Sequence, residues 1–278
     1  MTHSRTRIHE LLDEHGLAAR REFGQNFVAD PNTVRRIAEL SGVGTGDLVV
    51  EIGPGLGSLT LALVETGATV VAVEVDEGLA AVAEELLGDD AIVLTADAQK
   101  LDWDDLIATY GDGTTDGKVH VVSNLPYNIG TTLVLDILAD VAAVSTITVL
   151  VQAEVAERFA AGPGSKIYGI PSVMAALHSS AEVVASVPPS VFVPRPKVDS
   201  SVVRFVRRPD GAPVAHGELA RVVKAAFGQR RKMIRRSLSG ILSEDEIAAA
   251  GVDPTQRAEE LDLDRWVALA LAARPVAS

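Results

Sequence analysis

The segment VVEIGPGLGSLT at residues 49–60 decides the fold. The apolar run 48–52 is typical of a buried β-strand, and an apolar stretch with helical spacing follows the glycines. Gly53, Gly55 and Gly57 permit positive φ and leave no Cβ between the main chain and a bound molecule. The segment therefore predicts a strand, a tight turn and a helix that together form a ligand site.

The glycine spacing is G-x-G-x-G, and Ser58 stands where a dinucleotide-binding fingerprint has its third glycine. With Glu51 just ahead of the turn, the pattern resembles the first motif of S-adenosylmethionine (AdoMet) methyltransferases more than an NAD site. Glycine turns also serve as plain connections between strands and helices. The motif alone leaves both interpretations open.

Apolar strand-like runs alternate with helical stretches around this segment, which predicts right-handed β-α-β crossovers and a parallel sheet in an α/β fold. The expected strands are 48–52, 69–75, 91–95, 118–123, 145–151, 182–187 and 198–206. The expected helices of this part are 6–15, one that begins at 30–31, 58–66, 77–87, 103–110, 129–139, 152–161 and 170–179.

Acidic residues stand at the carboxyl ends of the predicted strands, where parallel sheets bind their ligands. Glu74 ends the second strand, about 20 residues after the glycine turn, where an acid can accept both ribose hydroxyls of a nucleoside. Asp97, followed by Ala98, ends the third strand, where a carboxylate can accept the amino group of adenine. A single acid there is commonplace, but successive polar strand ends behind a glycine turn indicate a nucleoside site.

The most specific segment, Asn124-Leu125-Pro126-Tyr127, follows the fourth strand. The exocyclic amine of a purine is a poor nucleophile because its lone pair is delocalised, so a methylating site must accept both N–H groups. The Asn124 side-chain oxygen and the Leu125 carbonyl suit that task, while Pro126 fixes φ. Tyr127 can stack on an extruded base. No strong base is required, since a sulfonium donor is already activated. In isolation, the segment is equally typical of a plain turn.

The formal net charge of −13 hides a strong asymmetry. Eleven acids and a single base occupy residues 74–105, whereas residues 219–243 contain seven bases and no acid. Basic helices contact phosphate backbones without reading sequence, so the second region predicts an RNA-contacting helical domain; a solvated helix face is the alternative. Its expected helices are 217–227, 230–239, 244–250 and 263–273, and its bases are Arg221, Lys224, Arg230, Arg231, Lys232, Arg235 and Arg236.

The sequence has no cysteine, which excludes disulfides and thiol catalysis, and its six histidines lack metal-ligand spacing. The longest apolar run, 141–151, is too short to span a bilayer, and the charged N-terminal segment has no signal core. We therefore expect a cytoplasmic protein without a metal site.

From about residue 18 to the end, the sequence resembles the KsgA family of ribosomal RNA adenine dimethyltransferases. The matching segments are FGQNF (23–27), EIGPGLGSLT (51–60), VEVD (73–76), DA (97–98), NLPY (124–127), VFVPRPKVDSSVV (191–203) and AFGQRRKMIRRSL (226–238). The resemblance implies a Rossmann-like class I AdoMet methyltransferase with a mostly parallel seven-stranded sheet and a small all-helical C-terminal domain. It also implies dimethylation of two adjacent adenosines in the 3'-terminal hairpin of small-subunit (16S) rRNA, with a role in subunit assembly.

Two domains are expected: a methyltransferase domain over 1–207, whose first 28 residues hold an N-terminal helix and cofactor loop, and an RNA-contacting domain over 208–278. The resemblance implies cofactor contacts from Gln25, Asn26, Val28, Glu51, Gly53, Gly55, Glu74, Asp97, Ala98 and Asn124. It implies that Asn124 borders both the methyl donor and the target amine and that Tyr127 stacks, beside the Leu125 and Pro126 interpreted above. Independently of the resemblance, an exposed Phe192 in the proline-rich segment could hold the target base from its other side, although that segment equally suits a stiff connection.

RNA contacts are also expected from Arg20, Arg21, Arg195 and Lys197. Glu22 stands where this family more often has a base, which weakens the RNA contact expected of that loop. The expected partner is small-subunit rRNA, within a partly assembled particle, and the expected state is a monomer.

Three alternatives stay open. An Erm-type methyltransferase would modify one adenine of large-subunit rRNA with the same cofactor motifs. Leu125 and the basic segments within 191–203 and 226–238 favour the KsgA family instead. A non-catalytic RNA-binding factor on the same fold is disfavoured by the intact Asn-Leu-Pro-Tyr segment. A small-molecule methyltransferase would leave the basic region unexplained.

Overall fold

The computed structural model describes residues 2–20, 24–111 and 118–274. The chain forms two compact units, which we call the sheet unit (residues up to 156 and 182–206) and the helical unit (157–181 and 207 onward). The domain boundary expected at 207 lies beside the last of these divisions. Residues 157–181, expected in the first domain, belong to the helical unit instead.

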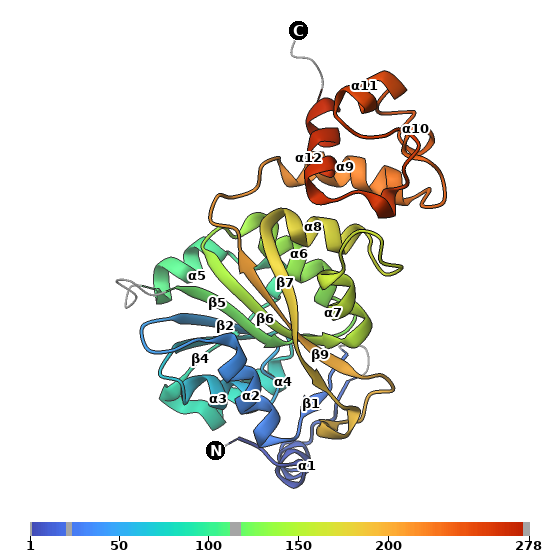
Figure 1. Ribbon diagram of the computed structural model, residues 1–278. Helices are drawn as coiled ribbons and strands as arrows, with labels where there is room; N and C mark the ends of the chain where they lie inside the picture. Colours follow the sequence, from blue (N-terminus) through green and yellow to red (C-terminus); the bar gives the residue numbers. More distant parts are fainter. Residues whose placement is uncertain (1, 21–23, 112–117, 275–278) are drawn as a thin grey trace. The chain divides into compact units, whose positions relative to one another are not determined.

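A seven-stranded sheet of order β4-β3-β2-β5-β6-β9-β7 forms the centre of the sheet unit (Figure 1). Neighbouring strands from β4 to β6 are parallel, and β9 runs antiparallel to β6. The strands are β2 (Leu48–Ile52), β3 (Thr69–Glu74), β4 (Ile92–Thr95), β5 (Val119–Asn124), β6 (Val144–Gln152), β7 (Ser179–Val187) and β9 (Ser200–Arg207). The predicted α/β fold with a mostly parallel seven-stranded sheet is confirmed.

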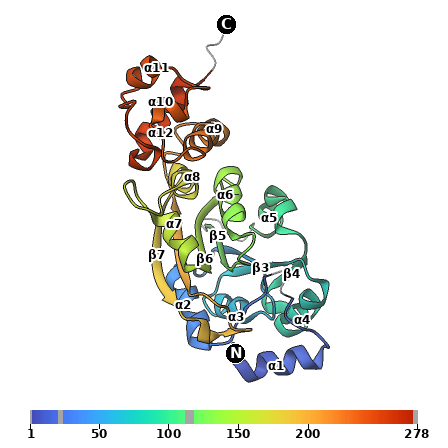
Figure 2. The ribbon, with the colours of Figure 1, turned by 90° about the vertical axis from the view of Figure 1, so that its right-hand side faces the viewer.

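Helices cover both faces of this sheet, which is why every residue of β2 is buried. On one face, Val49, Val122 and Leu150 of the sheet share a core with Ile37 and Leu63 of the helices above them. That face carries α2 (Pro31–Ser41), α3 (Ser58–Val64) and α4 (Glu77–Leu87), and the other carries α5 (Trp103–Tyr110) and α6 (Gly130–Asp140) (Figures 1 and 2). Two short 3-10 helices complete this part: η2 (Gly88–Asp90) follows α4, and η3 (Ala98–Lys100) follows β4.

A second, two-stranded sheet joins distant parts of the chain. Antiparallel strands β1 (Phe27–Val28) and β8 (Phe192–Val193) pair, and η4 (Pro189–Val191) leads into β8. Helix α1 (Arg5–Glu14) buries Ile8 and Leu11 against Phe27 and Val193 of this sheet.

The expectation of an exposed Phe192 is wrong. Phe192 is fully buried, lies opposite Val28 in the small sheet and belongs to the main hydrophobic core. Burial of an aromatic ring stabilises the fold most when the ring is completely removed from water. The pairing of β1 with β8 supplies residues against which the ring packs. Phe192 therefore does not hold a target base in this structure.

The helical unit packs around an aromatic cluster. Trp266 is fully buried, with its ring centroid 5.7 Å from that of Phe227, and Phe227 meets Tyr168 edge-on at 6.0 Å. The hydroxyl of Tyr168 donates to the Leu261 carbonyl at 2.8 Å. The helices are α7 (Ala153–Ala160, whose first residues belong to the sheet unit), α8 (Ile170–His178), α9 (His216–Phe227), α10 (Ile234–Ser237), α11 (Glu244–Ala249) and α12 (Leu263–Ala272), with η5 (Ala258–Glu260).

The basic helix predicted at 230–239 is largely wrong. Residues 228–231 form turns and residue 232 a bend, Met233 makes a β-bridge to Arg257, and within 230–239 only the four residues of α10 are helical. Pairing of this segment with the chain near Arg257 replaces the helical hydrogen bonds that propensity alone favours. In the described parts of the chain, no helix combines the length and apolarity that crossing a membrane requires.

The burial of Phe192 predicts a large structural role. We expect Phe192→Ala to lower the free energy of unfolding by about 3–5 kcal/mol, because it removes a fully buried ring and leaves a cavity. Val198→Ala is the control, since Val198 is 46% exposed in the same segment and its loss is expected to stay within about 0.5 kcal/mol. Urea unfolding of both variants tests this, and equal losses would contradict the assignment.

Candidate active site

A cavity of about 940 Å³, its open mouth included, lies at the carboxyl ends of β2, β3, β4 and β5. This is a size typical of small-molecule sites. All ten predicted cofactor residues line it, and so do Leu125, Pro126 and Tyr127 of the predicted target site. Parallel strands end at one edge, so residues distant in sequence converge there.

The glycines of the turn serve different purposes. Gly53 has φ of 70°, and a Cβ added there would meet only Pro126, at 4.0 Å, so the main chain faces open space. Gly55 has φ of 57°, and a Cβ there would lie 2.7 Å from the Phe27 ring. Gly53 therefore leaves room for a ligand, whereas Gly55 leaves room for Phe27.

Glu74 is held by the main chain around it. Its carboxylate accepts hydrogen bonds from the backbone N–H groups of Gly55 at 3.1 Å, Val75 at 3.0 Å and Asp76 at 3.1 Å. Burial raises the pKa of Glu74, and these three N–H groups oppose the rise. The strand end and the glycine turn are thereby joined through one carboxylate.

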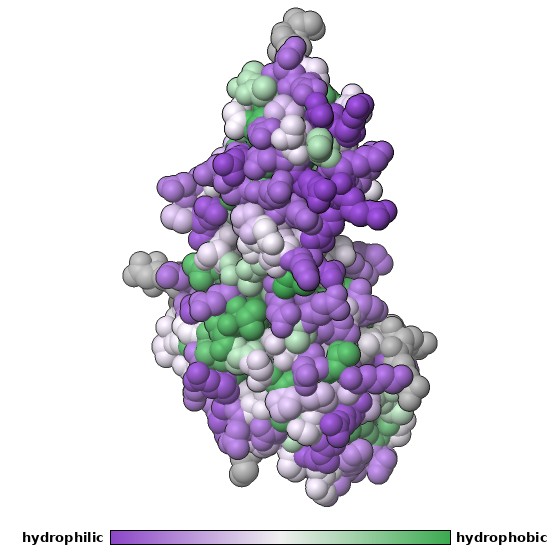
Figure 3. Space-filling view, turned by 45° about the vertical axis from the view of Figure 1, so that its right-hand side comes forward, coloured by the Kyte–Doolittle hydropathy of each residue, from purple (hydrophilic) through white to green (hydrophobic). Residues whose placement is uncertain are grey.

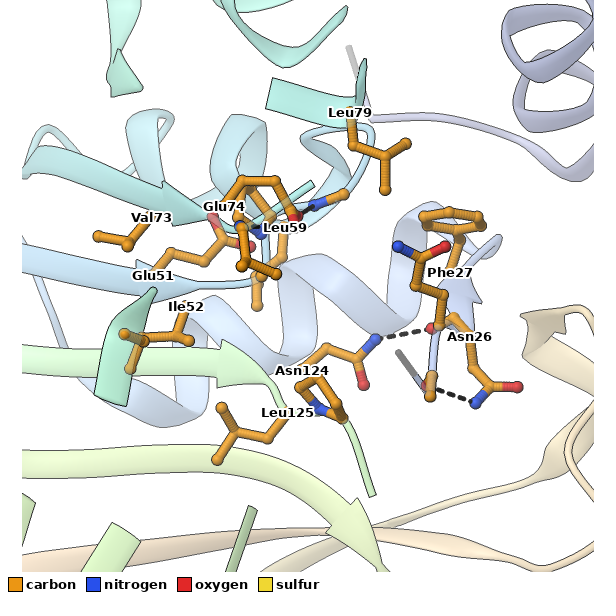
Figure 4. A pocket seen from close by; sticks show the side chains of 18 of the residues that line it. Asn26, Phe27, Glu51, Ile52, Leu59, Val73, Glu74, Leu79, Asn124 and Leu125 are labelled. Carbon is orange, nitrogen blue, oxygen red and sulfur yellow. Dashed lines mark hydrogen bonds between the residues drawn. The ribbon is translucent and has the colours of Figure 1, made fainter. Parts of the chain in front are cut away.

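Glu51 lies deeper than Glu74, with 1% of its surface exposed (Figure 4). Burial raises the pKa of Glu51 to about 8; the nearby Thr60 hydroxyl opposes the rise and the charge of Glu74 adds to it. Neither Glu51 Oε2 nor Thr60 Oγ1 makes a hydrogen bond of normal geometry within the described residues. At neutral pH, Glu51 is therefore mainly protonated and keeps an unused polar atom beside the cavity.

Asp97 differs from both glutamates because its side chain is 36% exposed. It caps η3 by accepting from the Gln99 N–H at 3.0 Å and lies 3.2 Å from the Lys100 ammonium. The Gln99 hydrogen bond, with a smaller effect from Lys100, lowers the pKa of Asp97. Asp97 thus stays ionised at the cavity wall.

Asn124 is oriented by the loop before β1. Its Nδ2 donates to the Asn26 carbonyl at 2.8 Å (Figure 4). Because a carbonyl can only accept, the amide must present Nδ2 to it, which leaves Oδ1 as an acceptor. Among the described residues, neither this Oδ1 nor the Leu125 carbonyl has a hydrogen-bond partner. Two successive residues at the end of β5 that line the cavity thus each keep an unused acceptor within the described residues.

The side-chain amides of Gln25 and Asn26 form hydrogen bonds with nearby main-chain groups. Gln25 Oε1 accepts from the Arg20 N–H at 2.7 Å, and Asn26 Nδ2 donates to the Gly24 carbonyl at 3.0 Å. The Arg20 guanidinium, predicted to contact RNA, lies 3.3 Å from the buried carboxylate of Asp76. The segment is therefore tied to the strand end that carries Glu74.

Sequence reasoning missed several apolar residues of the cavity. Phe27, Leu56 and Leu79 line it and also pack against α1, and Val75 is 53% exposed there. Phe27 lies inside the FGQNF segment, so that motif could have identified it as a residue of the cavity.

The predicted RNA-contacting bases fall into two groups. Arg221 donates to the Ala273 carbonyl, Arg230 pairs with Glu259 at 2.7 Å and Arg235 pairs with Glu244 at 2.9 Å. Exposed bases without a partner among the described residues are Lys224, Arg231, Lys232 and Arg236 in the helical unit and Arg195 and Lys197 in the sheet unit. Arg21 lies outside the described residues. Hydrophilic residues dominate the face of the helical unit drawn in Figure 3.

The sheet order, the glycine turn, the acidic strand ends and the Asn-Leu-Pro-Tyr segment define an AdoMet-dependent methyltransferase with the class I fold. Residues 16–273 match the family described as ribosomal RNA adenine dimethylase. The chain belongs to this family.

Relatives support this assignment along most of the chain. A protein of Cutibacterium acnes named ribosomal RNA small subunit methyltransferase A is 46% identical over 270 residues, covering 92% of this chain and 89% of its own. One of the same name from Phenylobacterium zucineum is 43% identical over 272 residues, covering 95% and 91%.

Solved structures agree on the fold. The 23S rRNA methyltransferase ErmE has a TM-score of 0.66 at 25% identity, covering 88% of this chain and 98% of its own. A dimethyladenosine transferase from Plasmodium falciparum has a TM-score of 0.70 at 20% identity, covering 86% and 94%, which speaks to the fold alone.

The buried acid predicts a pH-dependent stability. The pKa of Glu51 is about 8 in the folded chain and 4.5 as a free group, so the folded state binds more protons between these values. The stabilisation is complete below about pH 4.5 and is lost as the pH rises towards 8. Glu51→Gln is expected to flatten this decline and to be more stable than the parent above about pH 8.

Urea unfolding at several pH values measures this effect. The control is Glu84→Gln, which changes an exposed glutamate of α4. A decline of the same slope in the parent and in Glu51→Gln would show that Glu51 is ionised throughout.

Proposed function

We propose that this chain methylates the 6-amino group of two adjacent adenosines in the 3'-terminal hairpin of small-subunit (16S) rRNA, with AdoMet as methyl donor. The observation that carries the proposal is the fixed amide of Asn124, which leaves Oδ1 as an acceptor at the cavity that the next residue, Leu125, also lines. Two adjacent acceptors suit the two N–H groups of an adenine amine. The names of the relatives support the small subunit as substrate.

The residues around the cavity fit AdoMet. Gly53 leaves bare main chain for it, Glu74 would hold the ribose hydroxyls, and Asp97 would accept from the adenine amino group. The buried Oε2 of Glu51 is a polar atom that still lacks a partner in the described chain. When bound, AdoMet supplies a methyl group on a positively charged sulfur.

The chain's own residues then prepare the amine. Asn124 Oδ1 and the Leu125 carbonyl accept its two N–H groups, which draws the nitrogen out of conjugation and directs its lone pair. Tyr127 stacks on the extruded base and limits its rotation. After one methyl transfer and release of one amine proton to water, the nitrogen keeps one N–H, so a single acceptor is enough to orient the second transfer. Positioning, rather than base catalysis, is the main contribution of the site.

RNA is held by exposed bases that have no partner in the described part of the chain. Lys224, Arg231, Lys232 and Arg236 of the helical unit would contact phosphates, as would Arg195 and Lys197 of the sheet unit. We place the reaction in the cytoplasm, on a partly assembled small subunit, with the enzyme acting as a monomer. The similarity to ErmE keeps large-subunit rRNA as the second candidate substrate.

Methylation of isolated subunits tests the proposed substrate. Small and large subunits from cells lacking this protein are incubated with it and AdoMet, and methylated adenosines are mapped by mass spectrometry. We expect dimethylated adenosines in small-subunit rRNA only. Methylation confined to the large subunit would favour the Erm-type activity instead.

The same assay tests the acceptor role of Asn124. Asn124→Ala is expected to lower kcat by about 100-fold or more, the usual cost of removing one preorganised polar group at a reacting centre. The matched control is Asn128→Ala, an exposed amide of the adjoining turn that does not line the cavity. Equal activity of Asn124→Ala and Asn128→Ala would contradict the proposed mechanism.

Cofactor and RNA binding are expected to separate. Glu74→Ala should weaken AdoMet binding and leave RNA affinity nearly intact, because the acid lies in the cavity. Arg231→Glu with Lys232→Glu should do the reverse, and the slope of log affinity against log salt should fall by about one to two. The charge-matched control is Arg35→Glu with Arg36→Glu on α2. Calorimetry and filter binding measure both ligands, and parallel losses of both in each variant would contradict the separation.

A further inference from the structure

The side chain of Tyr127 is tied to a strand outside its own segment. Its hydroxyl lies 2.7 Å from Oγ of Ser200, the first residue of β9. Ser200 is fully buried, and Tyr127 is half-buried at the cavity. We propose that Ser200 is a positioning residue, which holds the Tyr127 ring in the plane that stacks on the target adenine. This inference rests on the function proposed above.

The turn that carries Tyr127 does not fix its ring. Ile129 and Gly130 both donate backbone hydrogen bonds to the Pro126 carbonyl, at 3.3 and 3.1 Å, so the main chain of the turn is set. A tyrosine side chain on such a turn still has several staggered rotamers. In the described parts of the chain, no aromatic ring packs against Tyr127. Within the described residues, the bond to Ser200 is the side-chain hydrogen bond that favours one of these orientations.

Ser200 is a rigid anchor because it belongs to the central sheet. Its backbone lies opposite Gln152 in the antiparallel β6–β9 ladder, and the Ala153 N–H donates to the Asp199 carbonyl at 3.0 Å beside it. The backbone of Ser200 is thereby fixed, and its buried side chain places the hydroxyl against that of Tyr127. The ring thus takes its orientation from the sheet rather than from the turn.

The phenol group is better suited to anchoring than to proton transfer. Burial raises the pKa of Tyr127, so its hydroxyl stays neutral at physiological pH. What Tyr127 offers the base is its ring face, and the burial of Phe192 removes the aromatic expected on the other side. The orientation of this one ring then matters more for holding the base.

This arrangement makes a specific prediction about two different residues. Tyr127→Phe keeps the ring and removes the hydroxyl, whereas Ser200→Ala keeps the phenol and removes its anchor. Each is expected to lower kcat about threefold to tenfold, which corresponds to one neutral hydrogen bond. Because both remove the same interaction, the double variant should be no slower than either single variant. The KM for AdoMet should stay unchanged.

A matched control lies next to the anchor. Ser201 is also buried in β9, but successive residues of a strand face opposite sides of the sheet, and Ser201 lies opposite Val151. Ser201→Ala is therefore expected to keep kcat within about twofold of the parent. Ser200→Thr retains a hydroxyl and is expected to recover most of the kcat lost in Ser200→Ala.

Single-turnover and steady-state methylation of small subunits by the full chain measure these effects, and thermal unfolding of each variant checks that it is folded. Additive losses in the double variant, or parent-like kcat in Ser200→Ala beside a slow Tyr127→Phe, would overturn the positioning role. If Ser200→Ala unfolds, Tyr127→Phe still tests the proposal, because a parent-like kcat in that variant would refute the positioning role. A parent chain that methylates no adenosine of either subunit would refute the proposed function itself.

Discussion

The hydrogen bond from the Asn124 side-chain amide to the Asn26 carbonyl is the contact on which the rest of the site depends. An amide carries donors at one end and an acceptor at the other, so the identity of its partner fixes which end is left over. A main-chain carbonyl takes the NH₂ group and leaves the oxygen. The same bond joins the loop ahead of β1 to the end of β5, so the wall expected to hold the cofactor also orients the group expected to meet the amine.

Three carboxyl groups at successive strand ends show how environment differentiates similar side chains. Glu51 is deeply buried and mainly protonated, Glu74 is buried but held by three N–H groups, and Asp97 is partly exposed and ionised. The charge of Glu74 disfavours ionisation of Glu51, in addition to the larger effect of burial. The protonated state of Glu51 relieves the repulsion between the two groups and lets Glu74 serve as the main acceptor towards a nucleoside.

Much of the fold followed from local patterns, because buried parallel strands are continuous apolar runs. The strand at 48–52 was predicted with its observed bounds, and residues at strand ends were predicted to meet because parallel strands end together. Phe192 was misjudged because its burial depends on pairing with β1, a long-range contact that local composition does not reveal. The Ser200 anchor was missed for a similar reason, since a lone serine in a strand carries no pattern.

The basic region shows a different limit of sequence reasoning. The excess positive charge of residues 219–243 was predicted correctly, but their conformation was not. The bridge between Met233 and Arg257 and the pairing of Arg230 with Glu259 are tertiary contacts. The same contacts divide the bases into those that stabilise the helical unit and those that stay exposed. Composition gives the total charge of such a region, whereas only the structure separates the two groups.

The target-site segment is a loop, yet each of its residues is held from a different direction. The Leu125 N–H donates to the Leu150 carbonyl at 3.1 Å, and the Pro126 carbonyl accepts from the start of α6. Asn124 is held by the loop ahead of β1 and Tyr127 by β9. Acceptors that must aim a weak nucleophile gain their effect from fixed geometry, which a free loop does not provide. The sheet and its flanking segments supply that rigidity, so the loop can approach the substrate and still behave as part of the framework.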